Sequence, residues 1–248
     1  MEDLSLDINV ILVEPSGPLN VGSVARLCQN FGVRELRLVA PRCDPNNEEA
    51  RKMAVKGKHL LDKAKQYSCL LDAIADCRKI VATSGRVDHG SIPLCSPKEG
   101  VKWVLGKKSK SSIALVFGRE DRGLTNEELL LAHKTVTIKT QSSYSSLNLS
   151  HAVGILLHEF HCNESQTSQE NQDKKTFLDP SAPEQLHLCL KDAEALLLEI
   201  GFLYKHTASA RMAKIRALLQ RAEIQQDEVS LIRGILRQIR WAMSKENS

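Results

Sequence analysis

The chain has 248 residues, a hydrophobic content of 42% and a formal net charge of +4. This composition supplies enough apolar side chains for a core and excludes most disordered chains, which combine low hydrophobicity with high net charge. Only 13 Gly and 8 Pro are present, which excludes collagen-like sequences. A charge of +4 permits a nucleic-acid partner without favouring one, so any basic surface must be local.

The N-terminal sequence and the cysteines favour a reducing, cytoplasmic setting. MEDLSLDINVILVEP has three acids and no cationic segment before its first apolar run, so we expect no signal peptide. The longest apolar runs, such as 8–13 and 113–117, are far shorter than the roughly 20 residues that a membrane-spanning helix needs. The 7 cysteines form no C-x-x-C pair, which indicates reduced and mostly buried thiols.

Short apolar runs alternate with helical patterns through the first two-thirds of the chain. Near-continuous runs of Val, Ile, Leu and Ala are typical of strands buried on both faces. The expected strands are 8–13, 35–40, 79–83, 113–117 and 135–139. The expected helices are 21–31, a long stretch within 48–75, 97–105 and 125–132. This alternation predicts an α/β domain with a mainly parallel sheet and helices on both faces.

Two of these helices have recognisable end signals. Asn20 precedes VGSVARLCQNF and Gly32 follows it, which predicts an N-cap and a helix stop. Thr125 is followed three residues later by Glu128, which predicts a capping box.

The composition changes abruptly after residue 162. Residues 163–180, NESQTSQENQDKKTFLDP, are almost entirely polar and predict a linker. Beyond them, helical periodicity at 184–202, 208–222 and 227–243 predicts a small helical module. The first of these helices has one apolar face, formed by Leu186, Leu190, Ala193, Leu197 and Ile200. The expected organisation is a domain at 1–162, a linker at 163–180 and a helical extension at 181–248.

Several common site motifs are absent from the sequence. No G-x-G-x-x-G follows the first strand and no G-x-S-x-G is present, which weighs against a dinucleotide site and an α/β-hydrolase. His158, His161 and Cys162 could meet at one helix end as metal ligands. With no H-E-x-x-H and no paired cysteines, surface side chains are the favoured interpretation, and no metal is expected.

Three segments place turn residues and polar side chains after predicted strands, at the sheet edge where open α/β sheets bind ligands. They are PSGPLNVGSVAR at 15–26, LVFGREDRGL at 115–124 and YSSLNLS at 144–150. Each alone has an ordinary interpretation. Arg26 could form a surface ion pair, and Gly118 and Gly123 could be turn residues. Asn148 could be a helix cap.

Together and in this order, the three segments resemble the motifs of the SpoU branch of the SPOUT RNA 2′-O-methyltransferases. The first resembles N-x-G-x-x-x-R at Asn20, Gly22 and Arg26. The second resembles F-G-x-E-x-x-G-L over 117–124, and the third S-L-N-L-S over 146–150. ATSGR at 82–86 and the C-terminal LLLEIGFL and VSLIRGILRQI are further similar to the TrmJ subgroup, which usually has alanine where this chain has Gly85.

The resemblance implies an α/β fold with a C-terminal trefoil knot, a homodimer, and S-adenosylmethionine bound in the knot and converted to S-adenosylhomocysteine. The implied cofactor-binding residues are Thr83, Ser84, Gly85, Gly118, Ile138, Ser145, Ser146 and Leu147. The implied reaction is 2′-O-methylation of tRNA at the anticodon-loop pyrimidine of position 32, a cytidine or uridine. A methyltransferase for another tRNA site or for ribosomal RNA is one alternative, and a non-catalytic RNA-binding protein is another.

The residues implied in catalysis are Arg26, Asn20 and Glu120. The family assigns removal of the 2′-hydroxyl proton to the arginine that Arg26 matches, yet a guanidinium stays protonated and is a poor base. We favour a role for Arg26 in holding a phosphate and stabilising the developing alkoxide; direct proton acceptance is the competing interpretation. Asn20 and Glu120 would orient Arg26 and the motif loops, or act as structural caps.

The C-terminal module has one charged segment. Residues 205–221 contain five Lys and Arg and no acid. Such a stripe fits RNA phosphates, in which case affinity falls with salt, and it equally fits a solvated helix face.

Overall fold

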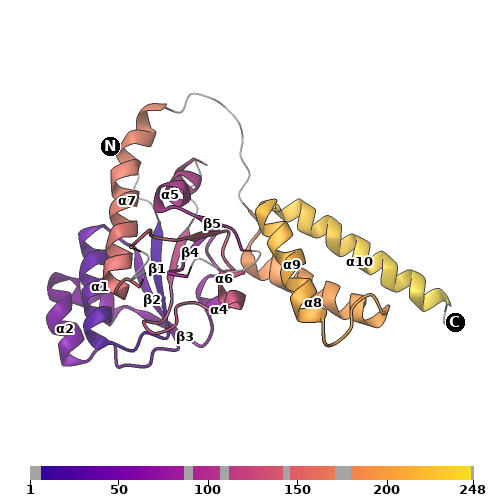
Figure 1. The fold of residues 1–248 in the computed structure, drawn as a ribbon, viewed down its shortest axis with the longest axis horizontal. Helices are drawn as coiled ribbons and strands as arrows, with labels where there is room; N and C mark the ends of the chain where they lie inside the picture. Colours follow the sequence, from indigo (N-terminus) through magenta and orange to yellow (C-terminus); the bar gives the residue numbers. More distant parts are fainter. Residues whose placement is uncertain (1–6, 87–91, 107–111, 142–145, 171–179, 247–248) are drawn as a thin grey trace. The chain divides into compact units, whose positions relative to one another are not determined.

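The computed structural model describes residues 7–86, 92–106, 112–141, 146–170 and 180–246 (Figure 1). The chain divides into two compact units, Met1–Phe177 and Leu178–Ser248. Within the described ranges, none of the helices is both long and apolar enough to cross a membrane.

A seven-stranded sheet forms the centre of the first unit. Its strands lie in the order β3-β2-β1-β6-β4-β7-β5, and every neighbouring pair is parallel. The strands are β1 (Ile8–Val13), β2 (Glu35–Val39), β3 (Lys65–Tyr67), β4 (Lys79–Thr83), β5 (Leu94–Cys95), β6 (Ile113–Phe117) and β7 (Lys134–Val136). All carboxyl ends therefore meet at one edge of the sheet.

Helices cover both faces of this sheet because alternate strand residues point to opposite sides. Val10 and Leu12 of β1 belong to one apolar cluster, and Ile11 and Val13 to the other. The first cluster includes α1 (Pro18–Asn30), α2 (Glu48–Ala54), α3 (Lys58–Asp62), α5 (Pro97–Leu105) and α7 (Leu149–Glu170). The second includes α4 (Leu70–Ala73) and α6 (Asn126–Leu129) (Figure 1). The predicted α/β class is confirmed, whereas the trefoil knot stays a prediction.

The start of α1 differs from the sequence prediction. Gly17 is the N-cap and Pro18 occupies the first helical position, where a missing N–H costs nothing. Asn20 therefore lies in the first turn instead of capping it, and its side chain is free for other contacts. The predicted stop is confirmed, since Gly32 follows the helix with a φ of +64°. The capping box of Thr125 and Glu128 is also present.

The predicted long helix within 48–75 is wrong. That stretch is broken into α2, the 3₁₀ helix η1 (Val55–Gly57), α3, the strand β3 and α4. Val55 has a φ of 49°, a left-handed conformation that a continuing helix does not allow. Apolar residues recur at helical spacing across the break, so periodicity alone did not locate it.

Further boundaries differ, among them that of α6, which spans Asn126–Leu129 instead of the predicted 125–132. Strand β7 spans Lys134–Val136 instead of the predicted 135–139. Helix α7 continues to Glu170, past the predicted linker start, and Asn163 Nδ2 donates a hydrogen bond to the Glu159 carbonyl at 2.7 Å. Glu and Gln are good helix formers, so a polar composition did not prevent the helix from continuing. Residues 171–179 of the predicted linker lie outside the described part of the chain.

The second unit consists of α8 (Pro183–Glu199), α9 (Ala208–Arg221) and α10 (Gln226–Glu246), which confirms the predicted helical extension. Its core joins Leu186, Leu190 and Ala193 to residues of the other two helices. Ile200 is 43% exposed, so the predicted apolar face of the first helix ends at Leu197.

Candidate functional site

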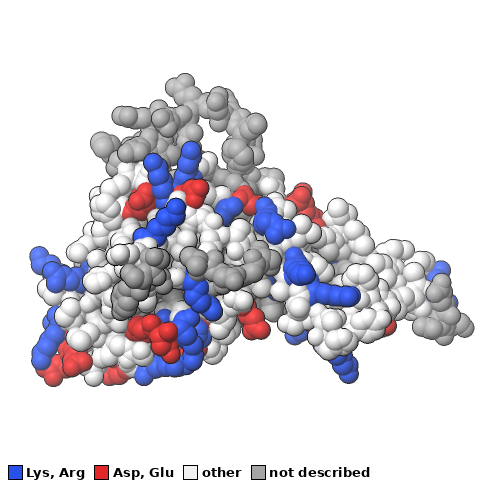
Figure 2. Space-filling model, in the orientation of Figure 1, with Lys and Arg blue, Asp and Glu red and all other residues white. Residues whose placement is uncertain are grey.

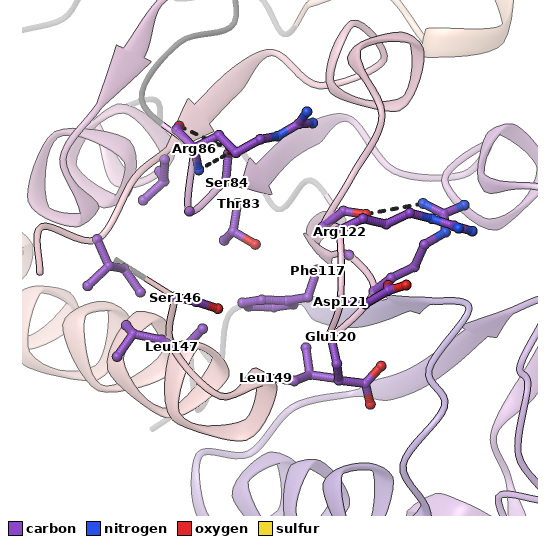
Figure 3. A pocket seen from close by; sticks show the side chains of 17 residues that line it. Thr83, Ser84, Arg86, Phe117, Glu120, Asp121, Arg122, Ser146, Leu147 and Leu149 are labelled. Carbon is purple, nitrogen blue, oxygen red and sulfur yellow. Dashed lines mark hydrogen bonds between the residues drawn. The ribbon is translucent and has the colours of Figure 1, made fainter. Parts of the chain in front are cut away.

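A cavity of about 260 Å³ lies at the carboxyl edge of the sheet, within the first unit. Strands β4, β6 and β7 end at it, and the first residues of α7 close its other side. Figure 3 shows Phe117 in the middle of the lining, with Thr83 above it and Ser146 and Leu147 beside it. The acidic side chains of Glu120 and Asp121 belong to the same lining. The cavity thus has apolar walls and a few polar groups, as organic-ligand sites do.

Most of the residues implied by the resemblance line this cavity. Of the cofactor-binding set, the lining includes Thr83, Ser84, Gly85, Gly118, Ile138, Ser146 and Leu147. Ser145 lies outside the described residues. Of the catalytic set, Glu120 lines the cavity, whereas Asn20 and Arg26 do not. Sequence reasoning missed Arg86, Phe117, Arg119, Asp121, Arg122, Gly123, Val136, Leu149 and Ala152. All of these except Val136 and Ala152 fall within the motif segments at 82–86, 117–124 and 146–150. The motifs therefore already indicated that these residues lie at the site.

The Glu120 carboxylate joins the second motif to the first. Its Oε2 accepts hydrogen bonds from the backbone N–H and hydroxyl of Ser16, both at 3.1 Å. Its Oε1 accepts from the Gly17 N–H and from Asn20 Nδ2, also at 3.1 Å. Burial alone would raise the pKa of Glu120, but these hydrogen bonds outweigh it and hold the pKa below its usual value. Glu120 is therefore an anion that shapes the loop before α1.

Asn20 extends this connection to the third motif. Its Oδ1 accepts a hydrogen bond from Asn148 Nδ2 at 2.9 Å. Asn148 Oδ1 in turn accepts from the N–H and hydroxyl of Ser150, at 2.9 and 2.7 Å, in the first turn of α7. A single chain of hydrogen bonds thus runs from Glu120 through Asn20 to Asn148. The three motifs, which are widely separated in the sequence, meet at one side of the cavity.

Arg119 makes a second connection between the first two motifs. Its guanidinium donates to both oxygens of Glu128, at 2.9 Å each, and to the Gly123 carbonyl at 3.2 Å. It also pairs with Glu14, which follows β1. The hydrogen bond from Arg119, assisted by Arg42, lowers the pKa of Glu14 to about 2. Adjacent residues Arg119 and Glu120 therefore hold the loop after β1 at two points.

Gly118 is required for the close approach of two backbone segments. A Cβ on this residue would lie 2.3 Å from the Gly123 carbonyl carbon and 2.4 Å from the Leu124 nitrogen. Arg86 closes the same region from the segment after β4, because its guanidinium donates to the Leu124 carbonyl at 2.6 Å. The 118–124 loop is thus folded tightly back along the cavity.

Arg26 lies away from this arrangement. Its side chain is exposed on α1, and among the described residues nothing is hydrogen-bonded or ion-paired to its guanidinium. The fold brings Glu120, Asn20 and Asn148 together but leaves Arg26 outside the cavity of its own chain.

The possible metal ligands His158, His161 and Cys162 do not form one cluster. His158 lies 3.5 Å from the Cys162 Sγ through its Nε2, while His161 packs against Phe31. Across the described residues, no group of three or more His, Cys, Asp or Glu side chains is placed to hold a metal.

Fold and site define an α/β protein with an organic-ligand cavity at the carboxyl edge of a parallel sheet, bordered by three connected sequence motifs. The model of the SpoU rRNA methylase family matches residues 7–158, so the chain belongs to this family. The model of the tRNA methyltransferase TrmJ C-terminal domain matches residues 184–248.

Individual relatives agree with this assignment. The chain is 35% identical to tRNA (cytidine/uridine-2′-O-)-methyltransferase TrmJ of Salmonella typhimurium, over 94% of this chain and 96% of that protein. It resembles the crystal structure of TrmJ from Z. mobilis with a TM-score of 0.80 and 26% identity, covering 94% and 98% of the two chains. It shares its fold with the SpoU methyltransferase AviRb from Streptomyces viridochromogenes in complex with AdoMet, with a TM-score of 0.51, 21% identity and coverage of 65% and 62%.

Proposed function

We propose that the protein is an S-adenosylmethionine-dependent tRNA 2′-O-methyltransferase that acts on a pyrimidine, cytidine or uridine, of the anticodon loop at position 32. The observation that carries this proposal is the chain of hydrogen bonds that joins three family motifs beside one cavity. The relatedness to TrmJ proteins along 94% of the chain supports the tRNA substrate. The cytoplasm is the expected compartment.

The cavity fits S-adenosylmethionine in its chemistry. Gly85 leaves the backbone accessible for an adenine edge, Gly118 lets the 123–124 backbone fold against the cavity, and Ile138 and Leu147 supply apolar walls. Thr83 and Ser146 add hydroxyl groups. The lining also carries charged groups of both signs, the carboxylates of Glu120 and Asp121 and the guanidinium groups of Arg86, Arg119 and Arg122, which suits a zwitterionic ligand. Ser145, next to the described lining, is proposed to belong to the same set.

When bound, S-adenosylmethionine supplies a methyl group activated by a sulfonium. The work left to this chain is mainly to hold a ribose 2′-oxygen at attack distance. Glu120 and Asn20 position the loop before α1, and Asn148 fixes the start of α7 against it. We assign Arg26 to the RNA phosphate and to the developing alkoxide, since its exposed guanidinium has no partner among the described residues.

This role of Arg26 needs a second copy of the chain. Arg26 is not part of the cavity lining of its own chain, so we propose a homodimer in which one protomer completes the site of the other. Exposed apolar side chains on the two helices that border the site, Leu19 on α1 (51% exposed) and Ile155 on α7 (40% exposed), suit such an interface.

The direct test is methyl transfer to unmodified tRNA. The purified protein is incubated with labelled S-adenosylmethionine and tRNA transcripts, and the nuclease-resistant 2′-O-methyl dinucleotide is mapped. We expect label at the anticodon-loop pyrimidine, and none when that nucleotide carries a 2′-hydrogen. Label at another tRNA site, or only in ribosomal RNA fragments, would replace this substrate with the corresponding alternative.

Arg26→Ala tests the catalytic assignment. We expect unchanged binding of S-adenosylmethionine, because Arg26 does not line the cavity, and a single-turnover rate lower by about 100-fold or more, as when a group that stabilises developing charge is removed. Arg78→Ala is the matched control, since Arg78 is also exposed but precedes β4 at the opposite edge of the sheet. An unchanged rate in Arg26→Ala would refute its role.

A further inference from the structure

The turn between α8 and α9 presents aromatic rings to solvent. Phe202 is 57% and Tyr204 58% exposed, while Leu203 between them is 2% exposed and belongs to the core of the second unit. Apolar side chains exposed side by side often mark a binding surface. We call Phe202, Tyr204, Lys205, His206 and Arg211 the aromatic–cationic patch.

The backbone under this patch is firmly held. The Leu203 N–H donates to the Leu197 carbonyl at 2.9 Å, and the Tyr204 carbonyl accepts from the N–H groups of Thr207 and Ala208 at 2.9 Å. Gly201 takes a φ of +75°, which makes the turn possible. The exposed rings are therefore presented by a fixed turn, anchored by a buried leucine.

A guanidinium supports one ring and an imidazole the other. The Arg211 guanidinium lies 6.0 Å from the Phe202 ring centroid, and its Nη1 donates to the Phe202 carbonyl at 3.0 Å. The His206 ring stacks on Tyr204 with a centroid distance of 6.0 Å and an interplanar angle of 22°. Each ring thus has one cationic or polar neighbour, and more than half of each residue's surface is left for a ligand.

The segment 205–221, which follows the exposed Glu199 at the end of α8, carries charge of one sign. Residues 205–221 include no acid, and Lys205, Arg211, Lys214 and Arg221 are exposed. Figure 2 shows Lys and Arg side chains on the visible surface of α9. The predicted stripe has one member fewer, because Arg216 is partly buried and its Nη2 lies 3.2 Å from Nδ1 of His187.

We propose that the aromatic–cationic patch binds unpaired RNA nucleotides. Bases stack on Phe202 and Tyr204, while Lys205 and Arg211 contact the adjoining phosphates. Stacking platforms bordered by cations are how proteins hold single-stranded nucleic acid, and unstacked loop bases are the parts of RNA available for stacking. A protein partner would be expected to meet charges of both signs. The inference rests on the proposed function in that it takes the tRNA anticodon loop as its RNA.

Binding of the full chain to two RNAs tests this inference without methyl transfer. One RNA is an anticodon stem-loop and the other a blunt duplex of equal length, both measured by fluorescence anisotropy in the absence of S-adenosylmethionine. For Phe202→Ala combined with Tyr204→Ala, we expect stem-loop affinity to fall about tenfold or more, with little change for the duplex. The exchanged pair Phe202→Tyr with Tyr204→Phe should restore stem-loop binding, because it keeps both rings. Leu231→Ala, which removes an exposed apolar side chain of α10, should bind like the parent.

Other outcomes overturn the inference. Unchanged stem-loop affinity in a double-alanine variant that melts like the parent removes the patch from RNA binding. An equal decrease in affinity for the stem-loop and the duplex would mean that the patch does not bind unpaired bases by stacking. A change in sedimentation without a change in RNA affinity assigns the surface to contact between copies of the chain. If the patch variants bind the stem-loop more weakly while the parent methylates no tRNA, the patch stands and the proposed function fails.

Discussion

Asn20 uses both ends of its side-chain amide. Nδ2 donates to Glu120 at 3.1 Å, and Oδ1 accepts from Asn148 Nδ2 at 2.9 Å. An amide can donate in one direction and accept in the other, which an ionised carboxylate cannot do. A carboxylate of the same shape would keep the bond to Asn148 and face Glu120 with a second negative charge. Asn20 is therefore a positioning residue whose chemistry, and not only its size, matters.

Asn20→Asp should reduce methyl transfer more than it reduces stability. We expect the single-turnover rate to fall by about 10- to 100-fold and the free energy of unfolding by about 1–3 kcal/mol, because a donor is removed and two carboxylates are brought together. Gln29→Glu is the matched control, an amide-to-acid change at an exposed position of the same helix. Rates are measured at saturating tRNA and S-adenosylmethionine. A variant as fast as the parent would separate Asn20 from catalysis.

Glu14 should contribute stability that depends on pH. Its pKa lies near 2 in the folded protein, lowered first by the hydrogen bond from Arg119. A depressed folded-state pKa stabilises the protein above the ordinary carboxyl pKa of 4.5, and this contribution disappears as the pH falls from there toward about 2. Glu14→Gln should cost about 1–3 kcal/mol at pH 7, and the gap to the parent should narrow steadily below pH ~4.5.

Urea denaturation at several pH values measures that gap. Glu48→Gln serves as the comparison, because Glu48 pairs with Lys52 at 2.6 Å where both side chains are largely exposed. Exposed pairs contribute about 0–1 kcal/mol, so this variant should differ little from the parent. A Glu14→Gln deficit that stays constant with pH would mean that the interaction removed by the substitution is not ionic.

Two helical glycines provide a contrast at the scale of elements. A Cβ on Gly22 of α1 would lie 2.2 Å from the Ala50 carbonyl oxygen of α2, so α1 and α2 pack closely only because this side chain is missing. A Cβ on Gly154 of α7 would lie 3.5 Å from Leu27, an ordinary van der Waals distance. The glycine of the first motif thus serves helix packing.

We expect opposite effects from the two alanine substitutions. Gly22→Ala should destabilise by about 2–3 kcal/mol or more, since backbone must move to make room. Gly154→Ala should be neutral or stabilising by up to about 1 kcal/mol, because alanine is the better helix former. Thermal unfolding followed by circular dichroism compares the two. Equal melting temperatures would show that α2 can shift away from α1 at little cost.

The sequence predicted the strands that are buried and missed those that are not. Strand β1 is buried along its whole length, and its unbroken apolar run made it recognisable. Strand β3 presents Lys65 and Gln66 to solvent at the edge of the sheet, so it carries no apolar pattern. The end of α2 depends on the left-handed backbone of Val55. A β-branched residue rarely adopts this conformation, and the local sequence does not predict it.

The site was predicted where a motif follows a buried strand. Thr83 ends β4 and Gly118 follows β6, and parallel strands bring both to the same edge. Val136 also lines the cavity, yet it lies inside an apolar strand and looked like core. The partners of Glu120 depend on how distant segments meet in space. Asn20 was interpreted as a cap because its type favours that position, although Gly17 and Pro18 already form the start of the helix.

At the scale of the whole molecule, the cavity and the proposed RNA-binding side chains of 202–221 lie in different units. Every described residue that lines the cavity lies within 83–152, inside the first unit. The exposed cations of 205–221 and the aromatic–cationic patch lie in the second. Binding of S-adenosylmethionine and affinity for RNA should therefore be separable by removing the second unit.

A chain that ends at Phe177 should bind S-adenosylmethionine like the full protein and bind tRNA more weakly. For a single-stranded segment, the slope of log K against log salt becomes shallower by about 0.7 for each phosphate that is no longer neutralised. With four exposed cations removed between 205 and 221, we expect a slope that is smaller by about 1–3. Isothermal titration calorimetry measures the first property, and anisotropy at increasing salt measures the second.

Replacing Lys205, Arg211, Lys214 and Arg221 with glutamine in the full chain controls for unfolding of the second unit. This variant should reproduce the reduced salt slope while keeping the helical content of the parent, because all four side chains are exposed. It should also keep part of the stem-loop affinity, since Phe202 and Tyr204 are still present. If shortening the chain leaves the salt slope unchanged, RNA phosphates are held by the first unit alone, and the cations of α9 belong to a solvated helix face.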